Sequence, residues 1–318
     1  MHPKKTKQST AASVRICAAV SATLITSGSA LSAGTFDPAL TQVSESQIVR
    51  WATGAQDLNR GLIDPAQPFL GNASQGSLSN AIGAADANRN SPPADTGTVS
   101  LGDFGSIVVT FGTPIVNGPG LDFAVFENGS DFGEFGLGLE LAFVEVSSNG
   151  TDFFRFQSVA DDADDIRAFG SFGSRPDATG LNNLAGNQAL DETFPTINER
   201  FGTGFDLEDL VGQAGPDLDL NNITAIRIID VGGLDPEVLA TLVDAENEPI
   251  FSAAQVDALT SFDSEGNVIL DSTGFSSPAN GFDLDAVGAS NIVPEPSVYA
   301  LLFGLAALTA VLWRRRGA

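Results

Sequence analysis

The chain of 318 residues is strongly acidic, with 40 Asp and Glu residues against 15 Lys and Arg and a formal net charge of −25. A negative field of this size repels nucleic acids and anionic lipids, so neither is an expected partner. It favours divalent cations or cationic surfaces as partners. The alternative is that dense carboxylates simply keep an extracellular protein soluble.

The first 33 residues are typical of a secretory signal peptide. Three lysines and Arg15 precede the mostly apolar stretch 16–25, and small residues then suit cleavage by signal peptidase after Ala30 or Ala33. The single cysteine, Cys17, lies inside this segment without the flanking residues of a lipoprotein site. We therefore expect an exported chain with no thiol, no disulfide and no acyl anchor.

Cleavage of this segment removes the only histidine, His2, and every lysine of the chain. Without His, Cys or Lys, the exported part cannot build a Ser-His-Asp or Cys-His pair, a His-ligated zinc site, a Schiff base or a Walker loop. Eight arginines and 39 acidic residues remain in the body, which gives it a net charge of −31. Chemistry by carboxylates is what remains, and we expect a protein that is not an enzyme.

Strand signals in the body become dense from residue 99. Residues 34–98 are rich in Gly, Asn, Ser and Ala, which predicts a loop-rich lead-in with at most one strand, over 46–51. The segments 106–111 and 121–126 are rich in β-branched and aromatic residues and are separated by the turn 117–120. We expect these two strands to pair with each other.

The clearest local prediction is a β-hairpin. Two alternating runs, 139–147 and 152–156, flank Asn149-Gly150. This dipeptide favours a type I′ turn, which needs positive φ at both central positions. Further along, the segment 223–231 is apolar on both faces and predicts a central strand, in which Arg227 requires a carboxylate partner.

Few helices are expected. A short one is predicted over 205–211, and Asp235-Pro236 supplies the N-cap and first position of another, with Val238, Leu239 and Leu242 as its apolar stripe. A last strand is expected over 281–287. Six or more short strands with few helices predict an all-β fold, a β-sandwich or jelly roll over residues 99–292.

Several carboxylates are candidate calcium ligands. In 282–285 the period of two places two carboxylates on one face of a strand, and the loop 263–271 spaces oxygen ligands around a glycine, loosely like a calcium loop. Because calcium takes six to eight oxygens, several segments would have to converge. The alternative is a turn and a strand with a solvated acidic face. The candidate ligands are Glu127, Asp230, Asp263, Asp271, Asp283 and Asp285.

The C-terminal segment 293–318 combines three features in a fixed order. These are Val293, Pro294, Glu295 and Pro296, then 17 apolar or small residues over 297–313, then Arg314, Arg315 and Arg316. As a helix the apolar run covers roughly 25 Å, the low end of a membrane span. The three arginines place their flank in the cytoplasm, so the body faces outward.

This order of features resembles the PEP-CTERM sorting signal of Gram-negative bacteria. The resemblance implies a transient anchor in the inner membrane, recognised and processed by an exosortase, and a body delivered to the cell surface or the extracellular medium. The alternative is an ordinary C-terminal membrane anchor.

A succession of short motifs in the body resembles the ectodomain of a group of PEP-CTERM cell-surface proteins, over about residues 46–290. That domain is similar to galactose-binding-like sandwiches, many of which carry a structural calcium, so a carbohydrate role is implied by fold analogy. The group has a basic residue where this chain has Asn187. The motifs lie at 100–102, 117–129, 142–150, 205–207, 226–231 and 281–287.

Three functions are compatible with these observations. We favour an exported, non-catalytic cell-surface or extracellular-matrix protein that binds calcium and extracellular polysaccharide. The second is a glycoside hydrolase or lyase, which needs only paired carboxylates, although Trp51, Tyr299 and Trp313 are its only Trp and Tyr residues for stacking on sugars. The third is a purely structural matrix protein.

Overall fold

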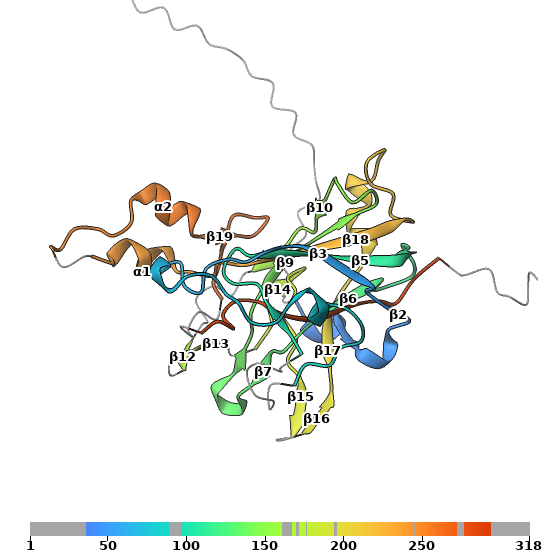
Figure 1. Ribbon diagram of the computed structural model, residues 1–318, viewed down its shortest axis with the longest axis horizontal. Coiled ribbons are helices and arrows are strands. Elements are labelled where there is room, and N and C mark those ends of the chain that lie inside the picture. The colour runs from blue at the N-terminus through green and yellow to red at the C-terminus, as the bar shows by residue number, and fades with distance from the viewer. Residues whose placement is uncertain are drawn as a thin grey trace, which may run out of the picture. The chain divides into compact units, whose positions relative to one another are not determined.

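The chain is described by a computed structural model over eight ranges. Strands in antiparallel sheets predominate there and helices are few and short, which confirms the all-β class (Figure 1). The segments predicted as signal peptide and, beyond Val293, as sorting signal lie outside these ranges. Within them, no helix is long and apolar enough to cross a membrane. The described ranges are 36–88, 97–160, 167–169, 172–175, 177–193, 196–243, 246–271 and 277–293.

The first sheet has β21 and β6 at its centre, and all of its strand pairs are antiparallel. β4 (Val99–Ser100) pairs with the start of β21. The path through the sheet is β1 (Gln42–Ser44), β17 (Phe201–Phe205), β6 (Phe123–Glu127), β21 (Asp283–Ala289) and β2 (Arg50–Trp51).

The second sheet is also antiparallel and has β18 at its centre, as the sequence predicted for this apolar segment. In it, Arg227 Nε donates a hydrogen bond of 2.6 Å to Glu145 Oε2, which confirms the expected carboxylate partner. The order is β10 (Phe154–Arg155), β9 (Ala142–Ser147), β18 (Ile223–Asp230), β5 (Ser106–Ile115) and β3 (Gly54–Asn59).

The two sheets pack face to face across one buried core, in a β-sandwich-like arrangement. Ile107 of β5 and Ile226 of β18 belong to the same buried cluster as Phe123 of β6 and Phe205 of β17. The rings of Phe123 and Phe205 are stacked at 5.2 Å between centroids. Burying a side chain of this size stabilises the folded state by about 1.5–3 kcal/mol. Because side chains alternate between the two faces of a strand, the apolar alternation determines which face of each sheet turns inward.

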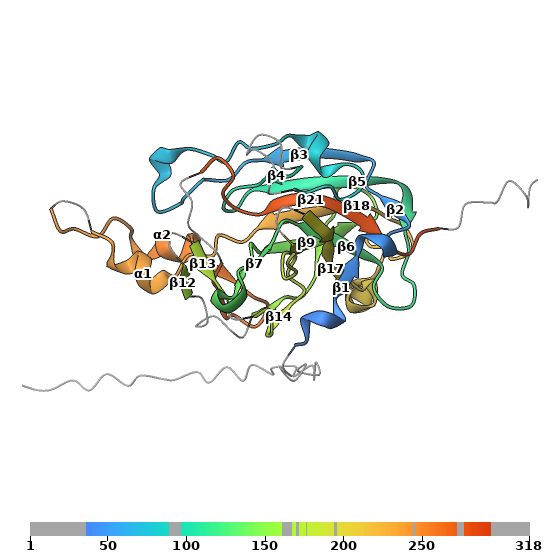
Figure 2. The same ribbon diagram turned by 90° about the horizontal axis from the view of Figure 1, so that it is seen from below.

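Short hairpins and helices surround the sandwich. In both views, helices α1 and α2 lie together, far from β2 (Figure 1, Figure 2). The remaining elements are β7 (Ser130–Asp131) with β8 (Leu137–Gly138), β11 (Val159–Ala160) with β14 (Leu181–Asn182), β12 (Arg167–Phe169) with β13 (Phe172–Ser174), β15 (Asp191–Thr193) with β16 (Thr196–Glu199), β19 (Ser261–Phe262) with β20 (Val268–Ile269), α1 (Pro236–Thr241), α2 (Ala253–Ala258), and the 3-10 helices η1 (Pro38–Leu40), η2 (Glu45–Gln47), η3 (Pro68–Leu70), η4 (Leu78–Ala81), η6 (Gly133–Phe135) and η8 (Leu207–Gln213).

The predicted pairing of segments 106–111 and 121–126 is wrong. Both segments form strands, but β5 pairs with β3 and β18, whereas β6 pairs with β17 and β21. The connection carries the chain from one sheet to the other, because Asn117 N bonds to Leu220 O and Asp122 N bonds to Phe205 O. The two strands therefore face each other across the core.

The predicted hairpin is confirmed, with Phe154 opposite Val146 and Arg155 opposite Glu145. The predicted type I′ turn is wrong, because Gly150 has a φ of 77° but Asn149 is not in the left-handed region. The Asn149 side chain instead accepts hydrogen bonds from the N–H groups of the two residues after Gly150. An Asx-type turn replaces the two-residue turn and makes the loop longer.

The helix predicted at Asp235 is confirmed, since Asp235 Oδ1 accepts 2.7 Å from Glu237 N at the start of α1. Leu239 of its stripe is buried, whereas Val238 is exposed. The helix predicted over 205–211 is present as the 3-10 helix η8. The lead-in contributes β1, β2 and β3, where at most one strand was expected, and these strands join both sheets.

Candidate functional site

Six carboxylates gather where strands of the two sheets begin or end. Their charges act on one another: Glu140 is influenced by Asp283, Glu127, Asp271 and Asp230, and Asp230 in turn by Asp103 and Asp271. β6 ends at Glu127, β18 ends at Asp230 and β21 begins at Asp283, and the other three lie in loops. The carboxylate cluster comprises Asp103, Glu127, Glu140, Asp230, Asp271 and Asp283.

Three members of the cluster accept hydrogen bonds from backbone or side-chain donors, through one or both carboxylate oxygens. Asp230 Oδ2 accepts from Phe282 N, and Asp271 Oδ2 accepts from Leu141 N at 2.7 Å. Asp283 accepts from Ser100 Oγ and, at 3.0 Å, from Asn128 Nδ2. These bonds join the loops between strands to the strand ends, so the sheets themselves position the carboxylates.

Four oxygens of the cluster are buried and accept no hydrogen bond within the described residues: Asp103 Oδ2, Glu127 Oε2, Glu140 Oε2 and Asp230 Oδ1. Glu127 and Asp230 are 3% and 1% exposed. A buried carboxylate oxygen without a donor costs several kcal/mol when ionised. The cluster therefore has an unmet requirement for protons or for positive charge.

Burial raises the pKa of several of these groups. For Asp103 burial, followed by the charges of Asp271 and Asp64, raises the pKa to about 9. For Glu127, burial and then the charge of Asp283 raise the pKa well above its ordinary value. Burial also raises the pKa of Asp283, but hydrogen bonds from Ser100 and Asn128 and the charge of Arg60 limit it to about 6.

Two arginines lie near the cluster, and the charge of Arg60 acts on one of its carboxylates. Arg60 donates to the backbone carbonyls of Gln75, Gly76 and Ser100, and its charge acts on Asp283. Arg175, 1% exposed, donates to Leu270 O, the carbonyl next to Asp271. Two cations against six carboxylates leave the cluster negative when its members are ionised.

The structure brings four of the six predicted ligands into this cluster: Glu127, Asp230, Asp271 and Asp283. Asp263 lies outside the cluster, and both of its oxygens already accept hydrogen bonds. The donors are the backbone N–H groups of Glu265, Asn267 and Ala160 and the side-chain amide of Asn267. Burial alone would raise the pKa of Asp263, but these hydrogen bonds lower it.

Asp285 also lies apart from the cluster. Its Oδ1 accepts 2.9 Å from Asp86 N. The register of β21 against β6 shifts between Leu284 and Ala286, so the simple alternation that grouped Asp283 with Asp285 ends there. Asp283 and Asp285 consequently contact different segments.

Sequence reasoning missed Asp103 and Glu140. Glu140 was assigned to one face of a predicted strand, but β9 begins only at Ala142. Asp103 follows Gly102 in a segment that gave no strand or metal signal. Its position is set by long-range backbone contacts, since Asp103 N bonds to Leu62 O at 2.9 Å.

The cluster has the ligand type of a calcium site, but its oxygens are not arranged around a common point. Carboxylate oxygens are the ligands that calcium prefers, and four of them lack donors here. Over the ranges that the structure describes, no three His, Cys, Asp or Glu side chains stand in an arrangement that holds a metal ion. An ion would therefore draw these side chains together or add carbonyl and hydroxyl oxygens to its shell.

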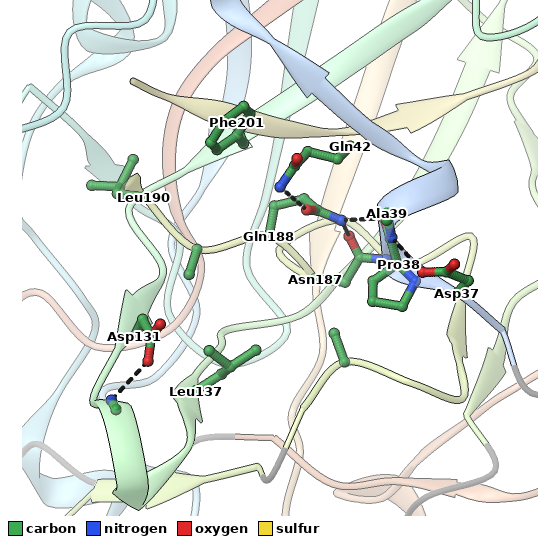
Figure 3. A pocket seen from close by; sticks show the side chains of 13 residues that line it. Asp37, Pro38, Ala39, Gln42, Asp131, Leu137, Asn187, Gln188, Leu190 and Phe201 are labelled. Carbon is green, nitrogen blue, oxygen red and sulfur yellow. Dashed lines mark hydrogen bonds between the residues drawn. The ribbon is translucent and has the colours of Figure 1, made fainter. Parts of the chain in front are cut away.

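A second site is a cavity of about 570 Å³ that opens near η1 and β1 (Figure 3). Amides, carboxylates and apolar side chains line it, and none of its described lining residues is Lys, Arg or His. The lining comprises Asp37, Pro38, Ala39, Gln42, Asp131, Gly133, Leu137, Ala178, Asn187, Gln188, Ala189, Leu190 and Phe201.

Three amide side chains form a fixed network in this cavity. Gln42 Nε2 donates to Gln188 Oε1 at 3.2 Å, and Gln188 Nε2 donates to Pro38 O at 3.0 Å and to Asn187 Oδ1 at 2.9 Å (Figure 3). Thr203 Oγ1 also donates to Asn187 Oδ1, at 2.8 Å. Asn187 is 1% exposed, and its Nδ2 finds no acceptor among the described residues.

The cavity and the carboxylate cluster adjoin each other through glycines. A Cβ on Gly129 would lie 2.6 Å from Gln188 O and 3.0 Å from Glu127 Oε2. A Cβ on Gly186, where φ is 85°, would lie 1.7 Å from Glu140 O. Any larger residue at these two positions would displace the backbone that supports both sites.

Comparisons with known proteins give no match for this chain among protein-family models, curated proteins or solved structures.

Proposed function

We propose that this chain is an exported, non-catalytic cell-surface or extracellular-matrix protein that binds calcium through the carboxylate cluster and binds extracellular polysaccharide. Export is supported by the signal-peptide features of residues 1–33 and by the sorting features of 293–318. Signal peptidase and an exosortase are its processing partners. The inner membrane holds the span 297–313 only until processing. The jelly-roll variant of the sandwich stays a prediction.

Calcium binding is supported above all by the buried carboxylate oxygens to which no described residue donates a hydrogen bond. Asp103, Glu127, Glu140 and Asp230 each carry one. One divalent ion among them would replace the missing donors and offset the mutual repulsion that raises their pKa values. Asp271 and Asp283 would complete an oxygen-only shell of the kind that calcium takes.

A non-catalytic role is supported by where the carboxylates lie. A glycoside hydrolase needs an acid and a base or nucleophile facing each other across a groove that admits the sugar. The cluster's buried carboxylates line no part of the described cavity, and the two carboxylates that do line it, Asp37 and Asp131, are exposed. The hydrolase or lyase remains the alternative, and turnover of a polysaccharide by the purified chain would favour it. Absence of any glycan binding would favour the purely structural alternative.

Calcium binding is tested by titrating the purified full chain, kept in detergent and stripped with EDTA, with CaCl₂ in a calorimeter. We expect a saturable heat and a higher melting temperature. Glu127→Gln removes one charged member and should weaken binding at least about tenfold. Glu237→Gln, at an exposed position on α1, is the matched control and should bind as the wild type does. Neither heat nor a melting shift in the wild type would contradict the proposal.

Export is tested separately, by fractionating cells with and without their exosortase. We expect the body outside the inner membrane in both, and retention in the membrane fraction when the exosortase is missing. An unprocessed, folded chain in the cytosol would contradict the proposed localisation.

A further inference from the structure

We infer that the amide-lined cavity of Figure 3 is the polysaccharide site and that it takes an uncharged, hydroxyl-bearing sugar residue. This inference rests on the proposed function, whose ligand class and binding site it names.

The orientation of the Asn187 amide is fixed by its neighbours. Its Oδ1 accepts from Gln188 Nε2 and Thr203 Oγ1, and turning the amide over would place Nδ2 against the Nε2 donor of Gln188. The Nδ2 group is thereby left as the donor, and no described residue accepts from it. A buried amide donor without an acceptor is unfavourable, and an oxygen of a ligand in the cavity would satisfy it.

Two acceptors line the cavity at exposed positions. Asp37 Oδ1 accepts from Ala39 N and Asp131 Oδ1 accepts from Gly133 N. No described residue bonds to the second oxygen of either carboxylate. A hydroxyl can both accept from Asn187 and donate to a carboxylate, whereas the amines of Lys or of a cationic ligand only donate.

The charge of the lining disfavours anionic sugars. The cavity is lined by two carboxylates, and no cationic side chain is among its described lining residues. Anionic sugars, such as uronic acids, would be repelled by this lining and by the strongly acidic chain around it. A neutral sugar meets no such penalty.

The lining also has apolar surface. Leu137, Leu190 and Phe201 give the cavity apolar stretches of wall. A sugar ring has C–H faces that pack on such a wall while its hydroxyls bond in the ring plane. The volume of about 570 Å³ lies within the range of roughly 300–1,000 Å³ that small-molecule sites occupy.

The test measures affinity of the full chain, saturated with CaCl₂, for hexasaccharides of neutral β-1,4-glucose, β-1,3-glucose and α-1,4-glucose. Oligogalacturonate is the anionic probe and fully deacetylated chitohexaose is the cationic one. We expect at least one neutral probe to bind and oligogalacturonate not to bind. Binding of only the anionic or only the cationic probe would overturn the inference.

Variants locate the site. Gln42→Ala removes an exposed amide that orients Gln188. It should lower the affinity for the neutral probe by about threefold to tenfold, which is the effect of one hydrogen bond. Gln56→Ala, an exposed glutamine on β3 in the other sheet, is the matched control. Asn187→Asp keeps an acceptor for Thr203 but replaces the donor, and should abolish binding.

The outcomes separate the two proposals. If a neutral probe binds and Gln42→Ala and Asn187→Asp both bind it as the control does, the cavity is not the site, although polysaccharide binding stands. If no probe binds while calcium still titrates, polysaccharide binding fails and calcium binding stands. Melting temperatures show whether each variant is folded. If Asn187→Asp is unfolded, the result for Gln42→Ala decides whether the cavity is the site.

Discussion

Two regions of this protein bury carboxylates in opposite ways. Asp122 is completely buried, and both of its oxygens accept hydrogen bonds: Oδ1 accepts from Gly118 N and Asn291 Nδ2, and Oδ2 accepts from Leu207 N. Asp230 is 1% exposed, yet its Oδ1 accepts from no described residue. Burial alone therefore does not identify a site. The count of donors around each oxygen separates a carboxylate that ties loops together from one whose buried charge is left uncompensated.

The largest expected effect is on the pH dependence of stability in the cation-free chain. Burial raises the pKa of Asp103 to about 9 and of Asp285 to about 7, from an ordinary value near 4. The folded chain then holds protons that the unfolded chain releases. The contribution of these two groups to the free energy of unfolding is therefore complete below pH 4 and is lost as the pH rises towards 9. Each tenfold difference in proton affinity between the two states corresponds to about 1.4 kcal/mol, so we expect a loss of several kcal/mol.

Urea denaturation in EDTA at pH 5 and pH 8 measures this loss. Saturating CaCl₂ at pH 8 should recover part of it, because a bound cation stabilises the ionised cluster. Equal or greater stability of the cation-free chain at pH 8 would show that the cluster is not under electrostatic stress.

The next largest effect concerns the fully bonded carboxylate. Asp122→Ala leaves the donors of Gly118, Leu207 and Asn291 without their acceptor, and should lower the free energy of unfolding by about 3 kcal/mol or more. Calcium should not change this loss. Urea denaturation with and without CaCl₂ provides the measurement, and a loss that calcium restores would remove the distinction between the two regions.

The smallest effect has the opposite sign. Asp230→Asn keeps an acceptor oxygen for Phe282 N while removing one buried charge. In EDTA the variant should therefore be more stable than the wild type by about 1–2 kcal/mol, and its response to calcium should shrink. A variant that is destabilised in EDTA would indicate that Asp230 already has its partners, as Asp122 does.

Local patterns predicted the parts of the fold that local patterns control. The hairpin around Gly150, the central strand 223–230 and the N-cap at Asp235 were predicted because alternation, apolar runs and capping residues are read within a few positions. The pairing of β5 with β6 was wrong because the sheet that a strand joins depends on a connection whose partners, Leu220 and Phe205, are far away in the sequence.

The candidate sites show the same limit. Glu127, Asp230, Asp271 and Asp283 were chosen because oxygen-bearing residues beside strands can converge. Nothing local indicated that Asp103 would join them. The cavity could not be predicted at all, since the hydrogen bond between Gln42 and Gln188 joins residues 146 positions apart. Such contacts have no period and no motif in the sequence.

The central place of β21 has a consequence for the export that we propose. This strand, Asp283–Ala289, comes last among the described strands, yet it lies between β6 and β2 and bonds to both. A chain that crosses a membrane from its N-terminus has β2 and β6 outside long before β21 follows, and their unpaired edges are open to other chains meanwhile. In a chain exported as proposed, completion of the first sheet would therefore wait for the end of translocation.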